Sequence, residues 1–177
     1  GGFAEVYVAT VERPAPASGL EQDKAVAVKI ISRGNMAERD WENRRRSHSR
    51  ESKAARALDH PGLVKGHDAG EDDSGDILFT VMPLGRRDLR TIISDEGPGA
   101  GNYSSERWLK RAGAYALQVC DALAALHAEG IYHRDVKPLN VMELDTPGRV
   151  ILIDYGIAKL AGDGASSGTL EGFASPE

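Results

Sequence analysis

The sequence predicts an α+β protein in which a small, β-rich part precedes a mainly helical part. Runs of β-branched and aromatic residues, which favour strands, dominate the chain before residue 83. A long run with helical periodicity, residues 105–128, lies in the second part. The character of the chain changes between the two parts, after Pro83-Leu84-Gly85.

One charged segment predicts the main helix of the first part. The residues from about Asp40 to Leu58 include no Gly or Pro, and His60-Pro61 follows them, so the helix is expected to end before this proline. An acidic turn, residues 71–75, is expected to join two strands. The strands predicted in this part are Val6–Val11, Lys24–Ile31, Leu63–Gly66 and Ile77–Met82.

The second part is expected to begin with a short helix, Asp88–Ile93, and to continue with a long one from about Ser105 to Ala128. Ser104 or Ser105 can cap the long helix, and Gly130 can end it. Short strands are predicted at Val141–Glu143 and Val150–Ile153. Helical spacing predicts one apolar stripe on the long helix, formed by Leu109, Ala112, Ala116, Val119, Leu123 and Leu126.

Composition restricts the class of protein. With 41% apolar and 28% charged residues, the 177-residue chain is typical of a soluble globular protein. A net charge of −5 argues against nucleic acid as a partner, and no apolar run approaches the roughly 20 residues that span a bilayer. The single cysteine, Cys120, fits a reducing, intracellular and cytoplasmic location. The chain does not begin with Met, and we expect it to be a fragment.

The segment Tyr132–Asn140, YHRDVKPLN, carries the strongest chemical signal. It places an acid, a cation and an amide at fixed offsets on one short loop. Asp135 can accept a proton from a hydroxyl, and Lys137 can neutralise charge on a transferring phosphoryl group. Asn140 can turn back to hold a metal ion. These residue types at this spacing indicate phosphoryl transfer.

Two further segments carry a lysine and an aspartate, charged residues of the kinds that can bind phosphate and metal. Ala27-Val28-Lys29, on a predicted strand, resembles the V-A-I-K motif, whose lysine takes a carboxylate partner on the following helix. Glu51 is the better candidate for this partner, because Glu42 lies at the predicted helix start. Asp154-Tyr155-Gly156 follows a predicted strand, nineteen residues after Asp135. Each of these segments is weak evidence when taken singly.

The ends of the chain add two weaker motifs. Gly1-Gly2-Phe3-Ala4-Glu5-Val6 resembles the second half of a glycine-rich phosphate-binding loop, with Ala4 where the third glycine usually falls. Ser175-Pro176-Glu177 resembles the A-P-E motif. Together, six elements occur in the order found in eukaryotic-type protein kinase catalytic domains. The chain resembles this family over nearly its whole length, from the glycine-rich loop to A-P-E.

The resemblance implies a bilobal kinase fold. The expected N-lobe is 1–82, the hinge 83–87, and the first part of the C-lobe 88–177, truncated at the activation segment. It also implies ATP and Mg²⁺ as cofactors. Asp135, Lys137 and Lys29 would be catalytic, and Asn140 and Asp154 would bind the metal. The residues expected to contact or position ATP are Gly1, Gly2, Val6, Ala27, Lys29, Glu51, Met82, Leu84, Met142 and Asp154.

The resemblance further implies a protein substrate phosphorylated on Ser or Thr. Lys137-Pro138, after Asp135, resembles the residues that serine/threonine kinases carry at this place in the loop. Arg134 is a cation that a phosphorylated activation loop could engage, and an upstream kinase could modify Ser166, Ser167 or Thr169. Thr169 is one residue out of the family register. The alternatives are a pseudokinase or nucleotide-binding scaffold, and a small-molecule kinase of the aminoglycoside type, which usually carries H-G-D in the catalytic loop.

Overall fold

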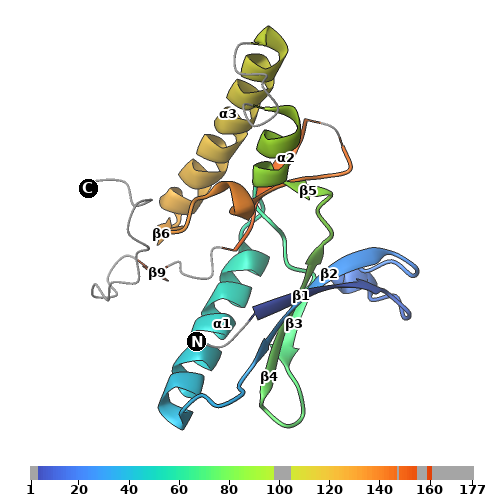
Figure 1. Ribbon diagram of the computed structural model, residues 1–177. Helices are drawn as coiled ribbons and strands as arrows, with labels where there is room; N and C mark the ends of the chain where they lie inside the picture. Colours follow the sequence, from blue (N-terminus) through green and yellow to red (C-terminus); the bar gives the residue numbers. More distant parts are fainter. Residues whose placement is uncertain (1–3, 98–104, 147, 155–158, 161–177) are drawn as a thin grey trace. The chain divides into compact units, whose positions relative to one another are not determined.

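The computed structural model describes residues 4–97, 105–146, 148–154 and the backbone of 159–160 (Figure 1). The described residues form two compact units. The first unit takes the residues up to Asp59 together with Val64–Leu84, and the second takes His60–Leu63 and the residues from Gly85 onwards. The lobe and hinge boundaries expected from the sequence stay predictions. The mixture of sheets and helices confirms the α+β fold class.

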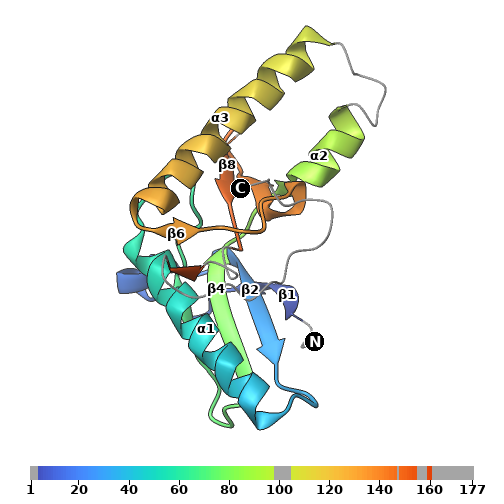
Figure 2. The ribbon, with the colours of Figure 1, turned by 90° about the vertical axis from the view of Figure 1, so that its left-hand side faces the viewer.

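The first unit is built on an antiparallel sheet of four strands in the order β1-β2-β4-β3. The strands are β1 (Ala4–Thr10), β2 (Ala25–Ser32), β3 (Asp68–Glu71) and β4 (Ile77–Pro83). A short 3₁₀ turn, Pro16–Ser18, lies in the connection between β1 and β2. Figure 2 shows helix α1 (Glu38–Ala57) running beside the strands of this sheet.

The strand register places four of the residues predicted to contact or position ATP on one face of this sheet. Lys29 of β2 lies opposite Val6 of β1 and Thr80 of β4. Directly opposed residues project to the same face, and so do residues two apart on one strand. The face that carries Lys29 therefore also carries Val6, Val8, Ala27, Thr80 and Met82.

Helix α1 covers this face, and the unit's hydrophobic core lies beneath it. Trp41, Ile31 and Leu78 are buried together, and Met36 packs against them. Ile31 and Leu78 are themselves cross-strand partners. Each lies two residues along its strand from Lys29 or Thr80, and so on the same face of the sheet. The helix begins two residues before the predicted start and ends one residue before the predicted end.

One predicted strand of this region is wrong. Leu63–Gly66 forms no strand, and only Leu63 makes an isolated bridge, to Leu152. On the side away from β2, β4 pairs instead with β3, Asp68–Glu71, which no pattern in the sequence indicated. The other three predicted strands of the first unit are confirmed, with ends shifted by at most two residues.

The second unit combines two helices with short strands. Asp88 caps helix α2 (Leu89–Glu96) through the amide of Thr91, and Ser105 caps helix α3 (Glu106–Ala128) through that of Trp108. Strands β5 (Arg87–Asp88), β7 (Val141–Glu143) and β8 (Val150–Leu152) form one sheet in that order. Strand β6 (Ile131–Tyr132) pairs with β9 (Lys159–Leu160).

The stripe of fully buried residues on helix α3 shares only Leu126 with the predicted stripe. Its buried residues are Trp108, Tyr115, Ala122 and Leu126, whereas Leu109 is 58% exposed. The buried stripe faces strand β8, which Gln118 ties to the helix by accepting a hydrogen bond from the Val150 amide at 3.1 Å. This contact holds the strand that leads to Asp154.

Candidate active site

The loop after β6 is held in place by a buried histidine. His133 is 1% exposed, and its Nε2 lies 3.0 Å from the carbonyl oxygen of Ile153. Its Nδ1 accepts a hydrogen bond from the Asp135 amide at 3.3 Å. A carbonyl partner on one nitrogen and an N–H partner on the other select the neutral tautomer with hydrogen on Nε2. Burial also lowers the pKa of His133, so the ring stays neutral.

The three polar residues expected to act together are in contact. Lys137 Nζ donates to Asp135 Oδ2 at 2.7 Å, and Asn140 Nδ2 donates to the same oxygen at 2.9 Å. Asn140 Nδ2 also donates to the Asp135 backbone carbonyl at 2.8 Å. The 3₁₀ turn Pro138–Asn140 makes this geometry local, because it folds Asn140 back over Asp135. Both side-chain contacts use Oδ2 of Asp135, and within the described residues neither Lys137 nor Asn140 bonds to Oδ1.

The two predicted metal ligands are connected through Ile153. The Ile153 amide donates to the Asn140 carbonyl at 2.8 Å, while the Ile153 carbonyl accepts from His133. Asp154 is the next residue. Because Asn140 uses its amide nitrogen to hold Asp135, its amide oxygen is the atom with which it can bind a cation. An amide oxygen and a carboxylate are hard donors, which suit Mg²⁺.

Two residues of this loop region adopt left-handed backbone conformations. Arg134 has φ 60° and Asp154 has φ 62°, and both are non-glycine residues beside the groups expected to do chemistry. Such conformations cost on the order of 1–3 kcal/mol each and persist where surrounding contacts fix them. The hydrogen bonds of His133 and Ile153 flank both positions.

The first unit carries the predicted phosphate-binding lysine. Lys29 lies on β2, on the same sheet face as three other residues predicted to contact or position ATP, Val6, Ala27 and Met82. Glu51 lies on α1 and accepts a hydrogen bond from Ser47 Oγ at 2.8 Å, whereas Glu42 pairs with Arg45. The ion pair between Lys29 and Glu51 stays a prediction.

Met142 and Gly85 are close neighbours in the second unit. A Cβ atom at Gly85 would lie 3.0 Å from Met142 Cβ and 2.5 Å from its Cε. The absence of a side chain at Gly85 therefore allows Met142 its position on β7. Leu84, the other predicted contact of this segment, is partly buried.

Several predicted residues lie outside the described part of the chain. They are Gly1 and Gly2 of the glycine-rich segment, Tyr155 and Gly156, the hydroxyl residues Ser166, Ser167 and Thr169, and the final Ser175-Pro176-Glu177. Their proposed roles rest on the sequence alone.

Sequence reasoning missed a buried ion cluster next to this loop. Glu143, the last residue of β7, is 2% exposed and accepts hydrogen bonds from Tyr115 Oη at 2.6 Å and Arg111 Nη2 at 2.8 Å. Arg87 Nη2 lies 3.2 Å from its other oxygen, and Glu96 bridges Arg87 and Arg111. Burial acts to raise the pKa of Glu143, but the hydrogen bonds from Tyr115 and the two arginines outweigh it and lower the pKa to about 2.

The chain is similar to known proteins over its whole length. The protein kinase domain family matches residues 1–177, and the chain belongs to this family. It is 36% identical over 172 residues to a probable serine/threonine-protein kinase of Corynebacterium efficiens, covering 96% of this chain and 23% of that protein. It is 33% identical over 172 residues to the serine/threonine-protein kinase PknB of Mycobacterium tuberculosis, covering 96% of this chain and 24% of that protein.

A third relative is the serine/threonine-protein kinase PrkC of Bacillus subtilis, 33% identical over 159 residues, covering 89% of this chain and 21% of that protein. The chain thus spans about a quarter of the length of the curated relatives it matches. Membership of the family implies the use of ATP. Within the described residues, no helix has the length and apolar character needed to cross a membrane.

Proposed function

We propose that this chain carries the ATP-binding and catalytic groups of a protein serine/threonine kinase. The observation that carries the proposal is the contact of Lys137 and Asn140 with one oxygen of Asp135. This arrangement leaves the other oxygen as a base with a cation beside it. The names of the relatives, all serine/threonine-protein kinases, support the same class of reaction.

The proposed reaction transfers the γ-phosphoryl group of ATP to a Ser or Thr hydroxyl of a protein. The bond between the γ-phosphorus and the β,γ-bridging oxygen breaks, a new P–O bond forms to the hydroxyl oxygen, and ADP leaves. Asp135 orients the hydroxyl and takes its proton, while Lys137 stabilises charge on the transferring group. Lys29, braced by Glu51, would hold the α- and β-phosphates.

Mg²⁺ would be held by Asn140 and Asp154, whose oxygen donors fit it. When bound, the ion neutralises phosphate charge. The contribution of this chain is to keep the two ligands together: His133 and Asn140 both bond to Ile153, the residue before Asp154.

We expect chelation of divalent cations by EDTA to abolish phosphotransfer, and added Mg²⁺ to restore it. Undiminished transfer in excess EDTA would contradict the metal assignment.

The direct test uses the full-length gene product. It is incubated with [γ-³²P]ATP and a degenerate Ser/Thr/Tyr peptide library, and labelled residues are identified. We expect label on Ser and Thr but not on Tyr. Failure to label any peptide, together with retained ATP binding, would favour a pseudokinase. Label on an aminoglycoside but on no peptide would favour a small-molecule kinase.

Treatment with an upstream kinase, followed by mapping of Ser166, Ser167 and Thr169, tests the proposed activation.

The contact of Gly85 with Met142 leads to a prediction about nucleotide affinity. Gly85→Ala would push Met142 from its position, because the new Cβ would lie 3.0 Å from Met142 Cβ. If Met142 packs against adenine, the KM for ATP rises several-fold while kcat changes little. Gly113→Ala is the matched control, since a Cβ there meets nothing within 4 Å. An equal KM for ATP in both variants would show that Met142 is not part of the proposed ATP site.

A further inference from the structure

Helix α1 has an unexpected residue at the centre of its buried stripe. Its buried residues are Trp41, His48 and Ala55, spaced by two helical turns each. The spacing is that of an apolar contact stripe, yet the middle position is a histidine that is only 6% exposed. A buried polar side chain requires a hydrogen-bond partner.

That partner belongs to the strand next to the predicted phosphate-binding lysine. His48 Nε2 lies 3.0 Å from the hydroxyl oxygen of Thr80 on β4. Thr80 is the direct cross-strand neighbour of Lys29 on β2, and the two side chains share one face of the sheet. The His48–Thr80 hydrogen bond therefore connects helix α1 to the part of the sheet that presents Lys29.

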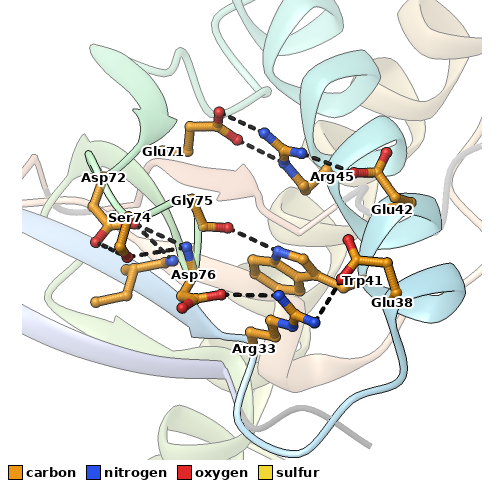
Figure 3. A network of polar contacts seen from close by, with 11 residues as sticks. Arg33, Glu38, Trp41, Glu42, Arg45, Glu71, Asp72, Ser74, Gly75 and Asp76 are labelled. Carbon is orange, nitrogen blue, oxygen red and sulfur yellow. Dashed lines mark hydrogen bonds and ion pairs between the residues drawn. The ribbon is translucent and has the colours of Figure 1, made fainter.

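Other contacts fix the N-terminal half of the helix to the turn between β3 and β4 (Figure 3). Trp41 Nε1 donates to the Gly75 carbonyl at 2.8 Å. Arg45 donates two hydrogen bonds to Glu71, at 2.8 and 2.6 Å, and a third to Glu42. Near the other end, Arg56 pairs with Asp68 at 2.7 Å. His48 makes its contact between these, one turn before Glu51.

We propose that His48 is a positioning residue, which sets helix α1 against strand β4 so that Glu51 faces Lys29. This inference rests on the proposed kinase function, in which Glu51 braces the lysine that holds the ATP phosphates. The outer contacts of Trp41, Arg45 and Arg56 fix the two ends of the helix. The His48–Thr80 hydrogen bond fixes its rotation and depth at the level of Lys29.

Burial first, and the neighbouring cations second, disfavour a protonated His48. Arg44 on α1 and Lys29 on β2 disfavour a protonated His48, while Glu71 on β3 and the Phe79 backbone on β4 favour it. Burial is the largest influence, and the net effect lowers the pKa of His48 below its usual value near 6.5. His48 is thus neutral at pH 7. Protonation at lower pH would place a second cation beside Lys29 and disturb phosphate binding.

The test compares kcat and the KM for ATP of full-length variants. Thr80→Val and His48→Leu each remove the hydrogen bond, and we expect each to raise the KM for ATP by roughly three- to tenfold, the effect of one lost hydrogen bond. The double variant should be no worse than the poorer single variant, because both remove the same bond. His48→Gln keeps a side-chain amide that can reach Thr80, so it should largely restore the wild-type KM at pH 7.

The pH profile of the KM for ATP distinguishes a positioning role of His48 from a role in the stability of the fold alone. In the wild-type protein, the KM for ATP should rise as the pH falls below 6.5, whereas in His48→Gln this rise should be absent. The matched control is His67→Gln. His67 lies in the same unit, with its Nδ1 2.8 Å from the Ser18 carbonyl oxygen, and within the described part of the chain it makes no hydrogen bond to helix α1. This variant should keep the wild-type profile.

The outcomes distinguish this inference from the function on which it rests. An inactive wild-type protein would overturn the kinase assignment itself. An active wild type whose Thr80→Val and His48→Leu variants keep the same KM for ATP would overturn only the role of His48. Additive effects of the two substitutions would also contradict it, because they would show that the residues act separately.

Discussion

Replacement of Asp135 by Ala is expected to lower kcat for phosphotransfer by at least roughly 10²-fold, the low end for loss of a general base. The variant removes the carboxylate that would take the hydroxyl proton, and it also leaves Lys137 and Asn140 without their shared acceptor. Lys29 is untouched, so the KM for ATP should change much less than kcat. Initial rates over a range of ATP concentrations separate the two constants.

Asp135→Asn refines this test. It preserves the size of the side chain and one acceptor oxygen for Lys137 or Asn140, but it cannot act as the base, and its kcat should fall in the same range. Asp95→Asn, an exposed carboxylate on α2 of the same unit, is the matched control and should keep wild-type rates. Wild-type phosphotransfer by either Asp135 variant would remove Asp135 from the catalytic role.

The catalytic loop was predictable because its geometry is local. Asp135, Lys137 and Asn140 lie within six residues of one another, and Pro138 restricts the backbone of the turn between them. The short 3₁₀ turn then brings the amide of Asn140 to the carboxylate without help from distant segments. Motif spacing alone therefore carries most of the information about this part of the site.

The wrong strand shows where local patterns fail. Leu63–Gly66 contains apolar residues suited to a strand, yet Leu63 makes only an isolated bridge. The actual strand, Asp68–Glu71, has a sequence of low β propensity. It is a strand because its backbone pairs with β4, and a pairing across a turn depends on tertiary structure rather than on composition.

Two buried polar residues were missed for a related reason. Sequence patterns treat His and Glu as exposed, so the sequence singles out neither His48, inside the charged helical segment, nor Glu143, at the end of a predicted strand. Their partners are distant in sequence: Thr80 is 32 residues from His48, and Arg87 is 56 residues from Glu143. The alternation of V-M-E in β7, with Val141 and Glu143 on the buried side, was the available signal.

The second large effect is expected on stability, from Glu143→Gln. The substitution keeps the shape of the side chain but removes the negative charge that Arg111 and Arg87 share, so two cations remain with Glu96 as their acidic partner. Removing one member of a buried ion pair costs about 3–5 kcal/mol. Urea unfolding of the full-length protein at pH 7, followed by tryptophan fluorescence, measures the loss. Glu106→Gln, whose salt bridge with Lys110 is largely exposed, should have a much smaller effect.

The pH dependence of the stability lost in Glu143→Gln identifies the cause of that loss. The pKa of Glu143 falls from 4.5 to about 2 in the folded protein, so its charge stabilises the fold fully above 4.5, and this contribution disappears as the pH falls towards 2. Glu143→Gln carries no such charge. The difference in unfolding free energy between wild type and variant should therefore be constant between pH 6 and 8 and smaller at pH 3. A difference that stays the same at pH 3 would show that packing, rather than the charge of Glu143, accounts for the lost stability.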